Sequence, residues 1–341
     1  MVMAPYPDLA VAGLGAFLLA LIGGGAFARL ARSRGWGQHI REWGPKIHAG
    51  KEGTPTMGGL VILVSFTAMM ALLWLLRQRW PSPQELLLLI GTLSFGGIGL
   101  LDDLLSLRSG CSQGLPIRYK LLLEFALSGL LIWALWQAQV QAGELLKVRV
   151  PFMEGWLELP PPAWAALALF VLVGTANAMN LTDGLDGLAA GTTLVILGAY
   201  LWLLPKQGEL FPSTLILGLS LLGFLWHNCH PAGIFLGDVG SLALGGFVAL
   251  LALLSGTALI LPLLGGLLVI ETLSVILQIM SYRLFKVRIF KVSPLHHHFE
   301  RAEGIDYEFL LPNRELPEPK ITLRLWIVAA ILALLGLLAS R

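Results

Sequence analysis

Charged residues and cysteines are scarce in this sequence. Asp, Glu, Lys and Arg make up only 13% of its 341 residues, whereas about a quarter of a typical soluble domain is charged. Hydrophobic residues account for 56% of the chain, and the mean hydropathy is +0.77. These values exclude an ordinary soluble domain and indicate a polytopic membrane protein. The two cysteines, Cys111 and Cys229, both fall in predicted cytoplasmic positions, where we expect no disulfide.

Signals for several other classes are also missing. The sequence has no long basic tract and no nucleic-acid-binding motif, so we expect no nucleic acid among its partners. No basic region precedes the first apolar run, which argues against a cleavable signal peptide. The sequence shows no internal repeat, and this weakens the case for an inverted-repeat transporter. Neither a Walker A loop nor a dinucleotide-binding glycine fingerprint is present.

Apolar runs dominate what is present, and about 20 apolar residues are enough to cross a bilayer as a helix. We therefore predict an all-α polytopic integral membrane protein, with residues 1–341 forming a single transmembrane helical domain. The ten predicted helices are 8–31, 55–76, 84–101, 119–140, 163–180, 187–205, 212–229, 238–257, 260–281 and 321–339. Residues 141–162 are proline-rich and amphipathic, which predicts a small hairpin or an interfacial helix between two of them.

Lysine and arginine predict the orientation of these helices. Sixteen of them fall in the alternate segments 32–54, 102–118 and 282–320 or their immediate flanks, against six on the opposite side. Because positive loops stay in the cytoplasm, these three segments are predicted to be cytoplasmic loops. An even number of helices then places both termini in the periplasm.

Four polar residues, Asn177, Asn180, Asp183 and Asp186, follow one another at intervals of three. On a helix this spacing places them roughly along one face. Apolar runs, 163–176 and 188–204, lie on both sides of the stripe. Polar groups at membrane depth are costly, so their default interpretation is functional.

The acidic residues gather on the predicted cytoplasmic side. Five of the seven aspartates fall at cytoplasmic helix ends, and so do two lysines, an asparagine and a run of three histidines. A shared site at the cytoplasmic membrane face is the simplest interpretation of this clustering. The residues are Asp102, Asp103, Asp183, Asp186, Asp238, Lys51, Lys120, Asn228 and His296 to His298.

Each motif also has a structural interpretation. The adjacent Asp102 and Asp103 repel each other, which a divalent cation would relieve, but they also suit a solvated helix end. Asp238 lies on a glycine-rich turn that opens a helix, which favours anions or simply close helix packing. The histidine run 296–298 can donate hydrogen bonds to phosphate or form a solvated loop. Thr54 and Pro55 predict a helix cap.

Together these groups favour phosphoryl chemistry at a membrane surface. Asp183-Gly-Leu-Asp186 does not continue as a calcium loop, since no Glu stands at its twelfth position. Carboxylates with few softer ligands suit Mg²⁺, which keeps several waters and bridges to substrate phosphates. Lysines and an anion-binding turn complete the set of groups that phosphoryl transfer needs.

Five stretches together resemble the polyprenyl-phosphate N-acetylhexosamine-1-phosphate transferase superfamily. They are Lys51–Gly59, Leu101–Asp103, Asn177–Gly187, Gly237–Ser241 and Pro294–Glu300, and they cover nearly the whole predicted cytoplasmic face. Each stretch alone is a weak signal, but five in the same order are specific. The run Pro294-Leu-His-His-His-Phe-Glu300 is similar to the branch that transfers phospho-N-acetylmuramoyl-pentapeptide.

The resemblance implies a reaction and its partners. Undecaprenyl phosphate would attack UDP-MurNAc-pentapeptide in the bacterial inner membrane, giving lipid I and UMP with Mg²⁺ as cofactor. One phosphoanhydride is lost and one is made, so no ATP is needed. The resemblance also implies a multi-pass protein in the lipid bilayer and a homodimer.

The resemblance further implies roles for individual residues. Asp238 would bind Mg²⁺ with Asp102 and Asp103, Asp102 would act on the lipid phosphate, and Lys120 would hold phosphate. Phe235 would stack on uracil. The implied catalytic residues are Asp102, Asp103, Asp238, Lys120, His296, His297 and His298. The implied substrate-binding residues are Lys51, Thr56, Asn177, Asn180, Asp183, Asp186, Asn228, Phe235, Gly237 and Gln278.

One departure and two alternatives remain. Ser106 stands where the family often has a lysine, so Lys120 and Arg118 would hold more of the phosphate charge. A sister transferase using UDP-GlcNAc is the first alternative, although the histidine run argues against it. An ion- or proton-coupled transporter is the second, although its acids would lie near the bilayer midplane rather than at helix ends.

Overall fold

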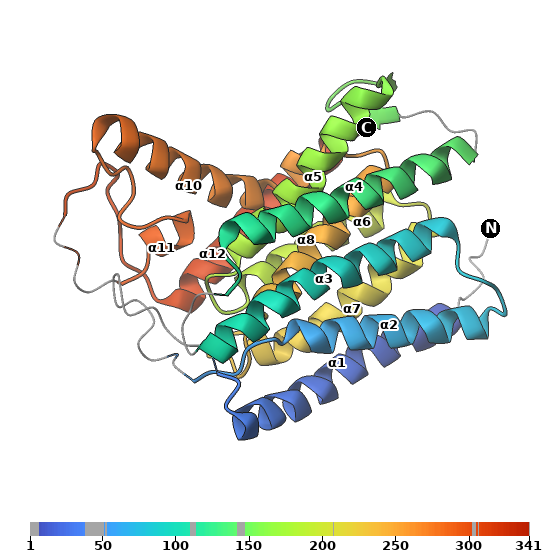
Figure 1. Ribbon diagram of the computed structural model, residues 1–341, viewed down its shortest axis with the longest axis horizontal. Helices are drawn as coiled ribbons and strands as arrows, with labels where there is room; N and C mark the ends of the chain where they lie inside the picture. The colour runs from blue at the N-terminus through green and yellow to red at the C-terminus, as the bar shows by residue number, and fades with distance from the viewer. Residues whose placement is uncertain are drawn as a thin grey trace.

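The computed structural model describes residues 7–37, 51, 53–109, 114–141, 147–206, 208–301, 305 and 307–340. This part of the chain is a helical bundle with one small hairpin (Figure 1). Its long helices are α1 (Pro7–Arg34), α2 (Gly59–Leu76), α3 (Pro83–Ser109), α4 (Ile117–Gln141), α5 (Pro161–Thr182), α6 (Leu188–Leu203), α7 (Leu210–Asn228), α8 (Gly237–Leu254), α10 (Gly266–Phe285) and α12 (Glu318–Ala339). Two single-turn helices, α9 (Leu261–Leu264) and α11 (Leu295–His298), flank α10.

Nine of the described helices are long and apolar enough to cross a membrane. The one remaining predicted span, 187–205, forms α6, which is apolar but has only 16 residues and is shorter than the other nine. Many large apolar side chains on the outer helices are exposed, as lipid-facing residues must be. The chain is therefore a multi-pass membrane protein of the all-helical class.

Helix α8 forms the centre of the bundle. It packs against α2, α3 and α5 (Figure 1), and 83% of its residues are buried. Glycines allow the backbones to touch: a Cβ at Gly59 would lie 2.2 Å from the Cα of Gly240, and one at Gly245 would lie 2.6 Å from the Cα of Ala176. Small residues at such crossings replace the hydrophobic driving force that lipid does not supply.

The helix ends meet in two groups. At the end we call the site end, α3, α5, α7 and α10 finish and α2, α4, α6, α8 and α12 begin. At the opposite end, Asp8 of α1 pairs with Arg77 after α2 over 2.5 Å. There the strands β1 (Lys147–Arg149) and β2 (Trp156–Glu158) form the hairpin predicted as one possibility, and Phe152 donates a backbone hydrogen bond to Ala339 of α12.

Two predicted boundaries near the site end are wrong. Helix α3 does not stop at residue 101 but continues to Ser109, so Asp102 and Asp103 lie inside it and not in a loop 102–118. The acidic pair does not end the helix because Asp103 turns inward to α8. Helix α2 begins at Gly59 and not at residue 55, because Pro55 pairs with Gly37 and its carbonyl accepts from Phe235.

Two further predictions need correction. The predicted span 260–281 is split into α9 and α10, since Gly265 adopts φ −104° and ψ 32° and interrupts the helix. The polar stripe is also only half helical. Asn177 and Asn180 lie in α5, but the helix ends at Thr182, and Asp183 and Asp186 lie in the turn that leads to α6. Gly187 allows this turn because its φ is +76°.

Candidate active site

The N-terminus of α8 is held against α3 by Asp103. The buried Asp103 carboxylate accepts hydrogen bonds from the backbone N–H groups of Asp238 (3.2 Å) and Val239 (3.0 Å). A carboxylate at this position satisfies donors that the helix leaves free and complements its dipole. Gly237 permits the approach, since its φ is +74° and a Cβ would lie 2.8 Å from an Asp103 oxygen. Asp103 therefore fixes where Asp238 stands.

Lys120 of α4 joins two carboxylates. Its ammonium lies 2.5 Å from Asp238 Oδ2 and 3.8 Å from Asp102 Oδ1. Asn180 donates to the other Asp238 oxygen over 2.8 Å and to the Ser241 hydroxyl over 2.9 Å. Asp102 in turn accepts from the backbone N–H of Leu115 over 3.1 Å. We call Asp102, Lys120, Asn180 and Asp238 the Asp238 cluster.

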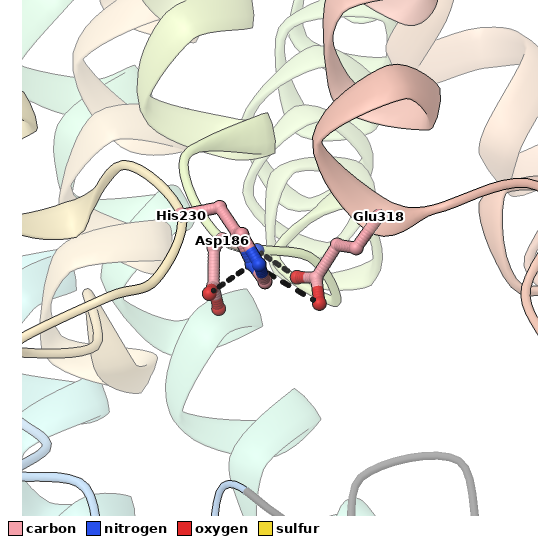
Figure 2. Close-up of side chains that lie close together, drawn as sticks. All are labelled: Asp186, His230 and Glu318. Atoms are coloured by element: carbon pink, nitrogen blue, oxygen red, sulfur yellow. Dashed lines mark hydrogen bonds and ion pairs between the residues drawn. The ribbon is translucent and has the colours of Figure 1, made fainter.

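A second lysine, Lys51, also joins two carboxylates. Its ammonium lies 2.7 Å from Asp186 Oδ1 and 2.5 Å from Glu318 Oε1. The other Asp186 oxygen lies 3.0 Å from His230 Nδ1. Figure 2 shows Asp186, His230 and Glu318 converging from the α5–α6 turn, the segment after α7 and the start of α12. These four residues are called the Lys51 cluster below, and Phe235 lies beside them with its ring centre 5.9 Å from the ammonium.

The charges of this cluster support one another. Burial works against the charged form of Lys51, but the carboxylates of Glu318 and Asp186 outweigh burial and raise its pKa. Burial would likewise raise the pKa of Asp186, but the hydrogen bond from Lys51 lowers it overall. For Asp183, by contrast, burial together with the Asp238 and Asp103 carboxylates outweighs the charge of Lys51 and raises its pKa well above the ordinary value.

The three consecutive histidines have different environments. His296 donates its backbone N–H to Glu271 Oε2 of α10, and its Nδ1 lies 3.1 Å from the same oxygen. The side chains of this pair are fully buried, and within the part of the chain that the structure describes, His296 Nε2 has no hydrogen-bond partner. A Cβ at Gly184 would lie 2.1 Å from that nitrogen, so His296 abuts the turn between Asp183 and Asp186.

His297 and His298 face other groups. His297 Nδ1 lies 2.5 Å from Glu300 Oε2, and burial together with the neighbouring His296 lowers the pKa of His297. The backbone N–H of Lys291 donates to His298 Nδ1 over 3.0 Å. His296 is therefore the histidine that the structure places directly against the turn bearing the predicted aspartates.

The polar groups of several other predicted residues form hydrogen bonds within the protein. Gln278 is buried, donates to Phe290 O and accepts from Ile289 and Phe290 N. Asn228 donates to Ile234 O over 3.0 Å. Asn177 donates to Glu124, a fully buried carboxyl group on α4.

Two predicted residues, Thr56 and Gly237, lie next to each other beside the Asp238 cluster. Thr56 is buried, and its hydroxyl would lie 3.0 Å from a Cβ on Gly237. The predicted substrate and catalytic residues therefore converge at the site end, some in the two clusters and some in the shell that holds them.

Comparison with known proteins decides the family. The model for Glycosyl transferase family 4 matches residues 86–256, which include Asp102, Asp103, Lys120 and Asp238. Residues 51–63 match phospho-N-acetylmuramoyl-pentapeptide-transferase signature 1.

Relatives that match nearly the whole chain support the same family. A phospho-N-acetylmuramoyl-pentapeptide-transferase of Rubrobacter xylanophilus is 39% identical over 95% of this chain and 94% of the relative. One of Moorella thermoacetica is 42% identical over 95% and 96%. One of Geobacillus kaustophilus is 37% identical over 98% of both chains.

The chain belongs to the phospho-N-acetylmuramoyl-pentapeptide-transferase family. It is thus an enzyme that transfers a group, and not a transporter. Membership confirms the resemblance predicted from the five sequence stretches, and the first of these stretches coincides with the family signature.

Four acidic or basic residues of the site were not predicted. Glu271 and Glu124 lie within the predicted apolar spans 260–281 and 119–140, and an acid inside a span is itself a functional signal that could have identified them. Glu318 stands between two prolines ahead of the last span, and His230 follows Cys229. Neither has a local sequence signal, since each joins the site only through the fold.

Two groups of residues could hold a cation. Asp186, His230 and Glu318 bring three possible ligand atoms within 4.8 Å of one another, but the Lys51 ammonium already neutralises two of them. Among the described residues, the three aspartates predicted as the metal set are not found as such a group, and both oxygens of Asp103 accept backbone hydrogens. Asp102 and Asp238 offer hard carboxylate oxygens beside one shared cation, and this donor set fits Mg²⁺, which keeps several waters and needs only one or two carboxylates.

Proposed function

We propose that this enzyme transfers phospho-N-acetylmuramoyl-pentapeptide from UDP-MurNAc-pentapeptide to undecaprenyl phosphate, forming lipid I and releasing UMP. The observation that carries the proposal is the pairing of Asp102 and Asp238 through Lys120 at the end of three apolar helices. Groups at this position are within reach of both a lipid phosphate at headgroup level and a water-soluble nucleotide. The names of the relatives support the sugar-peptide donor.

The same proposal includes the setting of the enzyme. The distribution of Lys and Arg favours a cytoplasmic site end, with both termini in the periplasm and the chain in the bacterial inner membrane. A homodimer remains part of the proposal through the family resemblance.

The residues of the Asp238 cluster have separate roles in this mechanism. Lys120 would bind phosphate oxygens and stabilise the negative charge that develops on them, since a cation in a water-poor site is worth more than one in bulk water. Asp102, on the last turns of α3, would position the lipid phosphate and accept its proton. Asn180 and Asp103 would hold Asp238 in place.

Asp102 and Asp238 would hold the Mg²⁺ ion. When bound, it would neutralise the diphosphate charge and so ease departure of UMP. Asp103 is better assigned to positioning, because its oxygens are both engaged by the backbone of α8.

The Lys51 cluster would hold the nucleotide half of the donor. Phe235 offers a ring for uracil, and Lys51 stands beside it with one donor hydrogen left after its two ion pairs. His296, oriented by Glu271, would face the sugar-phosphate side from beneath Gly184.

The test is UMP release by purified protein in detergent. The reaction contains UDP-MurNAc-pentapeptide and undecaprenyl phosphate, with Mg²⁺ or with excess EDTA, and each substrate is omitted in turn. We expect release only when both substrates and Mg²⁺ are present, and a loss of at least about 100-fold in Asp238→Asn. Release with UDP-GlcNAc instead would move the protein to the sister activity, and equal release in EDTA would contradict the Mg²⁺ assignment.

A further inference from the structure

Glu318, at the first turn of α12, contacts the three other members of the Lys51 cluster. Its Oε1 accepts from Lys51 Nζ over 2.5 Å and from the backbone N–H of Asp186 over 2.7 Å. Its Oε2 lies 3.6 Å from His230 Nδ1 (Figure 2). One carboxylate therefore ties a lysine, a turn and a histidine that lie between 88 and 267 positions away.

The geometry gives Lys51 two anchors. Asp186 and Glu318 each take one hydrogen of the ammonium, and their side chains are only 3% and 11% exposed. A free lysine side chain has many rotamers, and a ligand that binds it must remove this freedom at an entropy cost. Because Asp186 and Glu318 already restrain the Lys51 side chain, a ligand that binds it loses little affinity to this entropy cost.

Glu318 also holds in place Asp186, the other carboxylate that pairs with Lys51. Its bond to the Asp186 N–H holds the α5–α6 turn, and Thr322, one turn further along α12, donates to the Asp186 carbonyl over 3.4 Å. The last transmembrane helix thus supports the turn that follows α5, although the two are more than 130 residues apart.

We propose that Glu318 is a positioning residue for the nucleotide half of the donor, acting through Lys51 and Asp186. This inference rests on the proposed function of the Lys51 cluster, and it assigns to α12 a share in the affinity for a uridine diphosphate group. Glu318 itself does not touch the reacting phosphate in this assignment. Its loss should therefore alter nucleotide affinity and leave the rate of the chemical step nearly intact.

The test compares Glu318→Gln with a matched control, Asp8→Asn. Gln keeps the shape of Glu318 but removes its charge. Asp8 also forms a 2.5 Å ion pair with a partly buried cation, but at the opposite end of the bundle, and its side chain is 24% exposed against 11% for Glu318. For Glu318→Gln we expect the KM for UDP-MurNAc-pentapeptide to rise roughly 10-fold. The kcat and the KM for undecaprenyl phosphate should change less than about 2-fold, and Asp8→Asn should leave all three constants unchanged.

A double-mutant cycle separates this role from a loss of structure. If Glu318 acts through Lys51, then Glu318→Gln should raise the KM by less than about 3-fold in a Lys51→Gln background. Equal effects in both backgrounds, or a fall in kcat matching the rise in KM, would overturn the proposal. Thermal unfolding of each variant in detergent shows whether the proteins compared are equally folded.

Binding of UDP, measured by calorimetry without turnover, distinguishes this inference from the proposed function. Wild-type protein that binds UDP but releases no UMP would refute the proposed reaction alone. In that case Glu318→Gln should still weaken UDP binding roughly 10-fold, and Asp8→Asn should not. Unchanged UDP affinity in Glu318→Gln would refute the positioning role, whatever the turnover.

Discussion

Gly99 is a position where the backbone of α3 touches that of α8, and its replacement by Ala tests the geometry of the site. A Cβ there would lie 2.1 Å from the carbonyl oxygen of Asp238, 2.3 Å from its carbonyl carbon and 2.5 Å from the nitrogen of Val239. All three atoms belong to the backbone, so no side-chain rotation relieves the contact. Gly97 provides the matched control, since a Cβ at that position meets nothing within 4 Å.

The expected effect follows from these distances. Real Cβ contacts essentially never fall below 3.0 Å, so α3 and α8 must separate by about 1 Å, at a cost of about 1–3 kcal/mol. The same shift would stretch the hydrogen bonds from the backbone of α8 to Asp103, now 3.2 and 3.0 Å, beyond useful length. It would also move Asp102 relative to Asp238, and a displacement of about 1 Å can reduce catalysis on the order of 100-fold.

The assay measures UMP release and thermal unfolding of Gly99→Ala and Gly97→Ala in the same detergent. We expect Gly99→Ala to lose at least about 10-fold in kcat and to unfold at a lower temperature. Gly97→Ala should keep its activity and gain slightly in stability, because Ala costs about 1 kcal/mol less than Gly in a helix. Wild-type activity and stability in Gly99→Ala would show that α3 and α8 do not approach as closely as the reasoning requires.

Two further predictions concern the α5–α6 turn and its neighbour. The raised pKa of Asp183 means that the folded state binds a proton more tightly than the unfolded state, so stability falls as pH rises above the ordinary Asp range. Asp183→Asn should therefore raise the melting temperature by at least about 2 °C at pH 8 and little at pH 4, while weakening UDP binding; an equal shift at both pH values would contradict this. Glu271→Ala should lower the free energy of unfolding by about 1–3 kcal/mol, because it leaves the buried His296 without its hydrogen-bond partner; unfolding measured beside Glu271→Gln tests this, and equal stability of Ala and Gln would refute it.

The helices and the convergence of acids at one end were predictable, because each depends on local composition. Apolar runs locate helices wherever lipid requires them, and alternating helices bring every second end together. The helix boundaries were less predictable. Thr54 and Pro55 look like a cap, but Pro55 is instead held in an extended segment by Gly37 and Phe235.

Which partner each site residue contacts could not be predicted from the sequence. Asp102 and Asp103 are chemically identical neighbours, yet one faces Lys120 and the other the backbone of α8. Which way each points depends on the rotation of α3 against α8, and Gly99 sets the closeness of that contact. Glu318 is the extreme case, since its partner Lys51 is 267 positions away.

The charge balance of the whole site gives a reason for a divalent cation that does not depend on any single ligand. Six carboxyl groups belong to the two clusters or lie directly beside them, namely Asp102, Asp103, Asp183, Asp186, Asp238 and Glu318. Two ammonium groups, Lys51 and Lys120, each bridge a pair of them. Around the two clusters, carboxyl groups therefore outnumber ammonium groups. A nucleotide diphosphate entering such a site would meet net repulsion, and low dielectric surroundings strengthen it. Binding therefore needs more positive charge than Lys51 and Lys120 supply in the described part of the chain, and Asp102 with Asp238 is the carboxylate pair where one of the two oxygens is still 3.8 Å from its lysine. A Mg²⁺ ion there would reverse the local charge without disturbing the Lys51 cluster, which is why we assign the metal to the Asp238 cluster and the nucleotide to the other.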